Sequence, residues 1–281
     1  MMKLRVDHVT VCGPNLEQMR HEFALVGLRT SYGGRHANGV THMDLLAFPD
    51  GSYIELIAPL GSLSNATGMM SGWAKRMEEN AGAGAWAACV QRIHEETARL
   101  RAADIEARGP ESGSRLRPDG KKLEWETALL GPGAAGSVLP FLIEDKTPRE
   151  WRVPPLSEMS GIEGVAGVVI AVRDLAATTA LFRRAFRCGD PLVEEDSEFA
   201  ATLARFPNTP VILAVPRDAN AWVGKRIGRF GECPAAFLLK VSHLAPAAEG
   251  LAFDRHSRWF GKDIAWLDVE RLRGTRIGLM D

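Results

Sequence analysis

The chain has 281 residues, 46% of them hydrophobic and 25% charged, and its formal net charge is -1. This composition is typical of a globular protein with one large or two smaller domains, and it indicates no electrostatic attraction to nucleic acid. There is no apolar run long enough to cross a membrane, no signal-peptide pattern, and no disulfide framework among the four cysteines. We therefore expect a cytoplasmic protein that binds neither nucleic acid nor membrane.

The first part of the chain predicts a βαβββ unit. Residues 4–12 read as a strand, and Asn15 is a suitable N-cap for a helix that ends near Leu28. Three more strands are expected, with the turn Pro49-Asp50-Gly51 between the last two. Their ranges are 29–32, 40–48 and 53–57. The stretch 60–70, rich in Gly, Ser, Asn and Met, is expected to be a loop.

His8 and Glu55 lie in the first and last strands of this unit. Side chains alternate between the two faces of a strand, so His8 and Thr10 share one face while Val9 lies on the other. In the last strand, Glu55 opposes Ile54 in the same way. An imidazole and a carboxylate on one concave face suit a divalent metal ion. A core histidine bonded to a carbonyl is the simpler alternative for His8.

The pattern then recurs, which indicates repeated supersecondary units. A second unit is expected as strand 85–93, helix 94–103 and strands 114–116, 123–130 and 138–143. A third begins at Gly164, where residues 165–175 match 6–16 without a gap, and a weaker fourth begins near Ala235. The predicted fold class is α+β, with repeated βαβββ modules in cupped mixed sheets. The predicted domains are residues 1–150 and 164–281, joined by a proline-rich linker at 151–163.

Several segments together resemble the glyoxalase-like branch of the vicinal oxygen chelate superfamily, which includes glyoxalase, bleomycin resistance and extradiol dioxygenase proteins. The resemblance rests on five segments, all within residues 4–150. They are Asp7-His8-Val9, the glycine-rich 33–42, Gly51-Ser52-Tyr53-Ile54-Glu55-Leu56-Ile57, 115–120 with Trp125, and 139–144. The resemblance implies a divalent metal in a cup formed by two modules, with ligands from the first and last strands of each.

The resemblance implies three metal ligands: His8, Glu55 and Glu144. The fourth position falls near Ala87, which cannot bind a metal, so water, substrate or a nearby histidine would replace it. The run from Glu150 to Pro154 also departs from the His-Pro pair common in this branch. In the C-terminal half, Gly167 stands where the histidine would be and Ile212 where the glutamate would be, so this half is expected to be a degenerate repeat.

Other candidate site residues are polar or aromatic side chains near this cup. His36 and His42 are candidate catalytic acid–base residues, or alternatively solvated turn histidines. Tyr53 and Trp125 would line the substrate site, or pack in the core. Arg117, together with Arg115, would clamp a carboxylate, or lie in a solvated hairpin.

The resemblance permits more than one function, and the fold alone does not choose among them. The leading hypothesis is a lyase or isomerase that chelates two adjacent oxygens of a small substrate and stabilises an enolate or oxyanion. The alternatives are a ring-cleaving dioxygenase, which would need His36 or His42 as a second histidine ligand, and a metal-free small-molecule binding protein. The implied cofactor is Zn, Ni, Mn, Mg or Fe, and the resemblance allows a homodimer.

Overall fold

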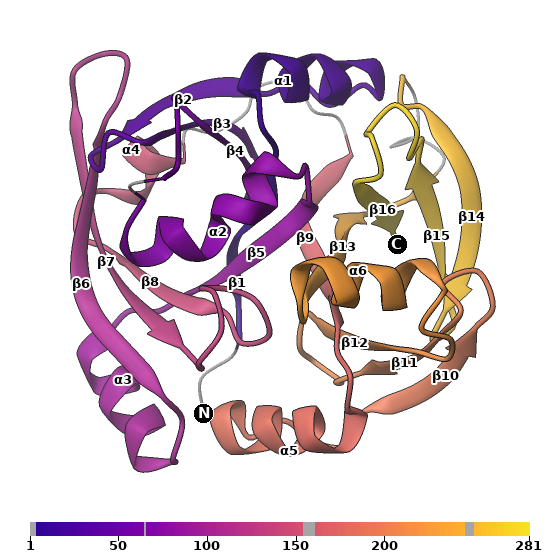
Figure 1. Ribbon diagram of the computed structural model, residues 1–281. Helices are drawn as coiled ribbons and strands as arrows, with labels where there is room; N and C mark the ends of the chain where they lie inside the picture. Colours follow the sequence, from indigo (N-terminus) through magenta and orange to yellow (C-terminus); the bar gives the residue numbers. More distant parts are fainter. Residues whose placement is uncertain (1–3, 65, 154–160, 245–249) are drawn as a thin grey trace.

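The structure is a computed structural model that describes residues 4–64, 66–153, 161–244 and 250–281. Its strands form a closed barrel and a second eight-stranded sheet, which lie side by side in Figure 1. The predicted α+β fold of repeated βαβββ modules is confirmed. Residues 154–160 of the predicted linker lie outside the described residues.

The barrel consists of two modules of the same topology. The first contains β1 (Val6–Cys12), α1 (Leu16–Leu25), β2 (Ser31–His36), β3 (Thr41–Ala47) and β4 (Tyr53–Pro59). The second contains β5 (Gly82–Cys89), α3 (Ile93–Ala102), β6 (Ala107–Leu116), β7 (Lys122–Leu130) and β8 (Phe141–Asp145). The strand order is β1-β4-β3-β2-β6-β7-β8-β5, so the modules meet at the antiparallel β1–β5 pair and again where β2 pairs with β6.

The second sheet repeats this order in an open form. The third module contains β9 (Ile162–Ala171), α5 (Leu175–Phe186), β10 (Leu192–Asp196), β11 (Ala201–Arg205) and β12 (Val211–Pro216). The fourth contributes β13 (Cys233–Val241), β14 (Phe253–Trp259), β15 (Lys262–Leu267) and β16 (Arg276–Met280). Within the described residues, the edge strands β10 and β14 do not pair with each other.

The helices cover the outer faces of the sheets or connect modules. The N-terminus of α1 is capped by Asn15, whose side chain accepts a hydrogen bond from the Gln18 amide at 3.0 Å. The buried residues Val9 and Ile54 belong to the core cluster that also contains Phe23 of α1. The residues that alternate with Val9 and Ile54 along β1 and β4 therefore face the inside of the barrel.

The stretch predicted as a loop at 60–70 instead leads into helix α2 (Gly68–Glu78). Its residues Met70, Trp73 and Met77 are buried, at the spacing of one helical face. Figure 1 shows α2 lying across the barrel. Two further helices are α4 (Arg149–Arg152), directly after the barrel, and α6 (Trp222–Phe230), between the third and fourth modules.

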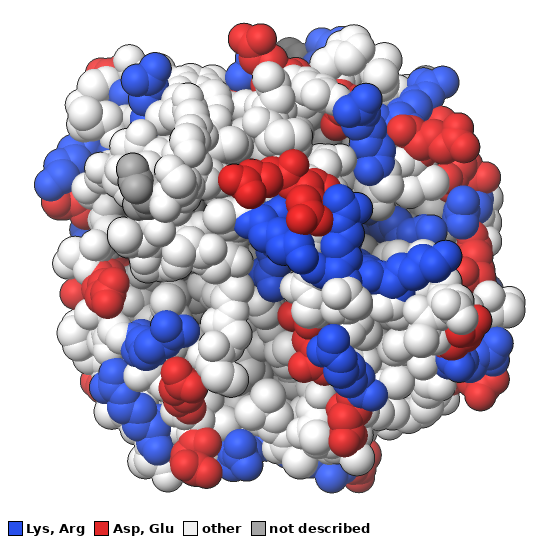
Figure 2. Space-filling view, viewed as in Figure 1, with Lys and Arg blue, Asp and Glu red and all other residues white. Residues whose placement is uncertain are grey.

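The surface carries both signs of charge. Figure 2 shows acidic and basic side chains interspersed over the visible face, and they also meet in its densest charged cluster. None of the helices in the described ranges is long and apolar enough to cross a membrane.

Candidate functional site

The predicted pair His8 and Glu55 lies inside the barrel. Strands β1 and β4 run parallel, and Thr10 lies opposite Glu55 in their register. The Nε2 atom of His8 lies 3.8 Å from Oε2 of Glu55, and the hydroxyl of Thr10 donates a hydrogen bond to the same oxygen at 3.1 Å. His8 is 4% exposed and Glu55 5% exposed, so the pair is removed from bulk water.

The ring of His8 is held on its other side by a buried carboxylate. Its Nδ1 lies 2.7 Å from Oδ1 of Asp7, and Asp7 is fully buried. Burial would raise the pKa of Asp7, but Arg152 and His8 outweigh burial and hold the pKa well below its ordinary value. Because the ionised carboxylate can only accept, Nδ1 donates the hydrogen bond and the lone pair of neutral His8 is on Nε2.

His36, at the end of β2, joins the pair from another strand. Its Nε2 lies 3.4 Å from Oε1 of Glu55. Its Nδ1 lies 2.9 Å from the hydroxyl of Thr41, which in turn donates to the sulfur of Met70 at 3.7 Å. His36 therefore faces Glu55 with its Nε2, while Thr41 holds its Nδ1.

Three polar groups thus converge: Nε2 of His8, Nε2 of His36 and the carboxylate of Glu55. A carboxylate that is so little exposed needs hydrogen-bond donors or a cation beside it. Burial would raise the pKa of Glu55, but the hydrogen bond from His36 and the charges of His8 and His36 outweigh burial and lower the pKa from 4.5 to about 2. The chemistry of this donor set fits a divalent ion, although the described residues contain no preassembled cluster of three or more His, Cys, Asp or Glu side chains that could hold one.

These groups line one side of a cavity of about 300 Å³. The size is at the lower end for small-molecule sites. The other walls are largely aromatic and apolar side chains from the strands and from α2. They include Met43, Tyr53, Ile57, Met69, Met70, Trp73, Trp125, Phe141 and Ile143. Both predicted substrate-site aromatics, Tyr53 and Trp125, therefore lie in this cavity with His36.

Glu144 does not join His8 and Glu55, which corrects the three-ligand set expected from the sequence. Its carboxylate accepts a hydrogen bond from the Ile93 amide at 3.0 Å, at the start of α3, and lies 3.2 Å from the ammonium of Lys146. It lines a different, open surface cavity.

The strand register explains this correction. Glu55 comes two residues after the β4 residue opposite His8, and Ile143 comes two residues after the β8 residue opposite Ala87. Ile143, not Glu144, is therefore the counterpart of Glu55, and it faces the cavity. A shift of one residue sends a side chain to the other face of a strand. The second module thus offers Ala87 and Ile143, neither of which binds metal.

Two further candidates also lie outside the cavity. His42 lies between Thr41 and Met43, whose side chains point inward, so its own ring points outward and packs at 6.1 Å against the ring of Tyr32. Burial lowers the pKa of His42. Arg117 donates a hydrogen bond to the Trp151 carbonyl at 3.0 Å and forms an ion pair with Asp119 in the following turn. Neither residue can contact a molecule held beside Glu55.

Among the described residues, the second sheet carries no equivalent site. Its register places Val168 opposite Val211, so Gly167 and Ile212 take the positions of His8 and Glu55, as expected. Aromatic side chains fill its concave face. Phe199, Trp222, Trp259 and Trp266 pack there with ring centroids 4.8–5.3 Å apart.

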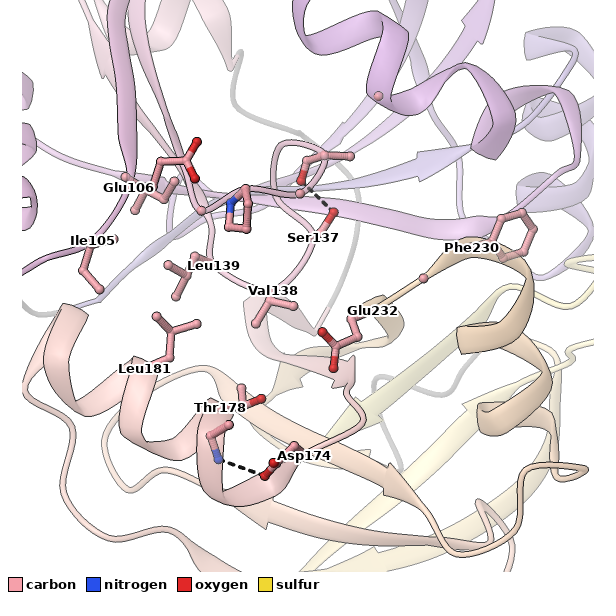
Figure 3. A pocket seen from close by; sticks show the side chains of 18 of the residues that line it. Ile105, Glu106, Ser137, Val138, Leu139, Asp174, Thr178, Leu181, Phe230 and Glu232 are labelled. Carbon is pink, nitrogen blue, oxygen red and sulfur yellow. Dashed lines mark hydrogen bonds between the residues drawn. The ribbon is translucent and has the colours of Figure 1, made fainter.

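A larger cavity of about 750 Å³ lies between the two sheets (Figure 3). Its polar groups already serve local structure: Asp174 caps α5 through the Ala177 amide at 2.9 Å, and Ser137 donates to the Ala134 carbonyl at 2.6 Å. Among its described lining residues there is no histidine or cysteine. The smaller cavity in the barrel is therefore the better candidate for chemistry.

Two important residues, Asp7 and Arg152, were not singled out as site residues from the sequence. Asp7 adjoins His8 in the chain, but strand alternation predicts that the two point apart. Arg152 and Arg115 are buried at the cavity, and Arg152 comes from α4, beyond both modules. No sequence signal marks Arg152 as a site residue, because its partners Asp7 and Tyr53 are 145 and 99 residues away along the chain.

Solved structures of similar fold cover nearly the whole chain. A hypothetical protein from Staphylococcus aureus aligns at 14% identity and a TM-score of 0.65 over 98% of both chains. A triple mutant of 4-hydroxymandelate synthase from Streptomyces coelicolor aligns at 12% identity and a TM-score of 0.65, over 100% of this chain and 93% of its own. At these identities the likeness concerns fold alone.

A shorter alignment is found with methylmalonyl-CoA epimerase from Mycobacterium tuberculosis, at 18% identity and a TM-score of 0.40, over 44% of this chain and 91% of its own. That TM-score is too low to carry an argument. No curated protein sequence matches the chain significantly. The family described as glyoxalase-like domain matches residues 6–186, which is more than half of the chain. The chain therefore belongs to the family with a glyoxalase-like domain.

Proposed function

We propose that this protein is an enzyme of the lyase or isomerase type that acts on a small organic molecule with a carbonyl or two adjacent oxygens. The observation that carries the proposal is the convergence of His8, His36 and Glu55 on one wall of the cavity inside the barrel. A buried carboxylate beside a buried and a partly exposed imidazole is costly to remove from water, and perturbed titratable groups of this kind are concentrated at functional sites.

His8 and Glu55 are the residues that would hold a divalent metal. Bound there, the metal would act as a Lewis acid for the oxygens of the substrate. The Nδ1–H of His8 is committed to Asp7, which leaves Nε2 as the donor atom. The low pKa of Glu55 keeps its carboxylate ionised at neutral pH and makes it a poor general base but a good anionic ligand.

His36 would move the proton. Its Nε2 takes the proton from the substrate carbon next to the carbonyl, the electrons of the broken C–H bond pass to the carbonyl oxygen, and an enolate results. Glu55, 3.4 Å from Nε2, stabilises the imidazolium that forms. Return of a proton to the opposite face of the same carbon completes an epimerisation, and return to a neighbouring carbon completes an isomerisation. The apolar walls from Trp73, Trp125 and Phe141 exclude water from this step.

His36 also separates this proposal from its two rivals. In a ring-cleaving dioxygenase it would be the third ligand, because two histidines and one carboxylate are the usual set for Fe(II). In a metal-free binding protein it would only neutralise Glu55, whose carboxylate already has contacts with His8, His36 and Thr10.

The test is the metal content of protein purified without a His-tag and incubated with Zn²⁺, Ni²⁺, Mn²⁺, Mg²⁺ or Fe²⁺, measured by elemental mass spectrometry. We expect about one equivalent in the wild type and loss in His8→Ala and Glu55→Gln. Retention in His36→Gln supports the proton-transfer role, whereas loss supports the dioxygenase set. His42→Gln is the matched control, because its ring lies outside the barrel. No binding by folded wild-type protein would refute chelation.

The same proposal places the protein in a reducing compartment, the cytoplasm. Its four cysteines are all free, with Cys12 and Cys233 buried and Cys89 and Cys188 partly exposed. Free cysteines are usual where thiols are kept reduced.

A further inference from the structure

Arg152 reaches the candidate site from outside both barrel modules. It is the last residue of α4, which follows β8, and it is only 3% exposed. Its guanidinium donates to both carboxylate oxygens of Asp7, at 3.0 and 2.8 Å, and to the hydroxyl of Tyr53 at 3.0 Å. A hydrogen bond to Asp145 anchors the same side chain from the other direction.

Two of these partners, Asp7 and Tyr53, hold the ring of His8. Asp7 accepts from its Nδ1 at 2.7 Å, and the Tyr53 ring stacks on it with centroids 4.7 Å apart and planes 22° apart. The hydrogen bond to Asp7 therefore determines which ring nitrogen of His8 carries the hydrogen, and stacking on Tyr53 fixes the plane of the ring. Arg152 donates hydrogen bonds to both residues, whereas Arg149 bonds only to Asp7 of the two and lies over the Tyr53 ring at 5.8 Å.

We propose that Arg152 is a positioning residue that holds His8 as the Nδ1–H tautomer, with its Nε2 lone pair directed at Glu55. The inference rests on the proposed function, in which Nε2 is the atom used. Arg152 binds Oδ1 of Asp7, the oxygen that accepts from His8, as well as Oδ2. The planar guanidinium matches a carboxylate in this two-point manner, which fixes the orientation of the carboxylate.

Arg149 provides a matched control. It also contacts Asp7, but only through Oδ2 at 2.6 Å, and its remaining hydrogen bonds go to Asp145 and to the Gly51 carbonyl. It is on the same helix as Arg152, and within the described residues it has no hydrogen bond to the Tyr53 hydroxyl. Arg149→Met should therefore remove one positive charge near Asp7 without releasing the oxygen that orients His8.

The experiment is a long-range ¹H–¹⁵N correlation spectrum of metal-free protein with ¹⁵N-labelled histidine, at one fixed pH at which His8 is neutral. We expect His8 to be the Nδ1–H tautomer in the wild type and in Arg149→Met, and a mixture of tautomers in Arg152→Met. Tyr53→Phe should keep the tautomer, because the Asp7 bond remains. Arg152→Lys should restore it in part. A circular dichroism spectrum establishes folding of each variant.

A second readout is the affinity for Zn²⁺ alone, measured by competition with a chelating dye. Loss of a group that orients a histidine ligand typically weakens metal binding 10–100-fold, which is the decrease expected for Arg152→Met. If folded Arg152→Met, or the milder Arg152→Lys, keeps the wild-type tautomer and Zn²⁺ affinity, Arg152 has only a structural role. If the wild type binds no Zn²⁺, the proposed function fails, and the tautomer alone still decides the role of Arg152.

Discussion

Substituting Arg226 with methionine should markedly destabilise the protein, although the residue does not line the candidate site. Arg226 belongs to α6, and its guanidinium donates to the carbonyls of Ala81, Ala83 and Pro234, of which Ala83 lies in strand β5 of the barrel and Ala81 directly precedes it. Methionine keeps the apolar stem and removes all three hydrogen bonds. At about 1 kcal/mol for each bond, the loss is about 3 kcal/mol of unfolding free energy.

The assay is equilibrium urea unfolding, followed by far-UV circular dichroism and tryptophan fluorescence. For a slope of about 3 kcal/mol/M, the midpoint should fall by about 1 M. Arg229→Met is the matched control on the same helix. Arg229 is 57% exposed and pairs with Glu79 at 2.5 Å, so its loss should cost at most about 1 kcal/mol. Equal midpoints for the two variants would refute the importance of the buried contacts between α6 and the barrel.

Two further predictions concern titrating groups. The lowered pKa of Glu55 stabilises the fold above pH 4.5 by about 3 kcal/mol, and this contribution is lost as the pH falls from 4.5 toward 2. The unfolding free energy, measured with urea, should fall between pH 7 and pH 4 by about 1 kcal/mol less in Glu55→Gln than in the wild type. An identical fall in the two proteins would contradict the low pKa of Glu55. Burial raises the pKa of Cys12 to about 12, so iodoacetamide at pH 8 should label Cys89 well before Cys12, as peptide mass spectrometry would show. Labelling at equal rates in folded protein would contradict this, and unfolded protein, in which both react, is the control.

The local pattern of the sequence was sufficient to predict the modules and one half of the site. Alternation with a period of two placed His8 and Glu55 on the inner faces of β1 and β4, and the barrel confirms that placement. The same reasoning, with the internal repeat, predicted correctly that Gly167 and Ile212 replace them in the second sheet. These results depend only on which face of a strand a residue occupies, which neighbours along the chain determine.

Register and long-range contacts could not be predicted in this way. Glu144 was displaced from the site because β8 pairs with β5 one residue away from the position expected, and a shift of one residue reverses the face. The approach of His36 to Glu55 depends on β2 and β4 lying on either side of β3 in a closed barrel. The sequence by itself thus determined which module carries the chemical groups. Only the tertiary structure placed Arg152 beside Asp7, 145 residues away along the chain. A buried carboxylate is stable only when a cation lies next to it, and here that cation comes from a distant part of the chain.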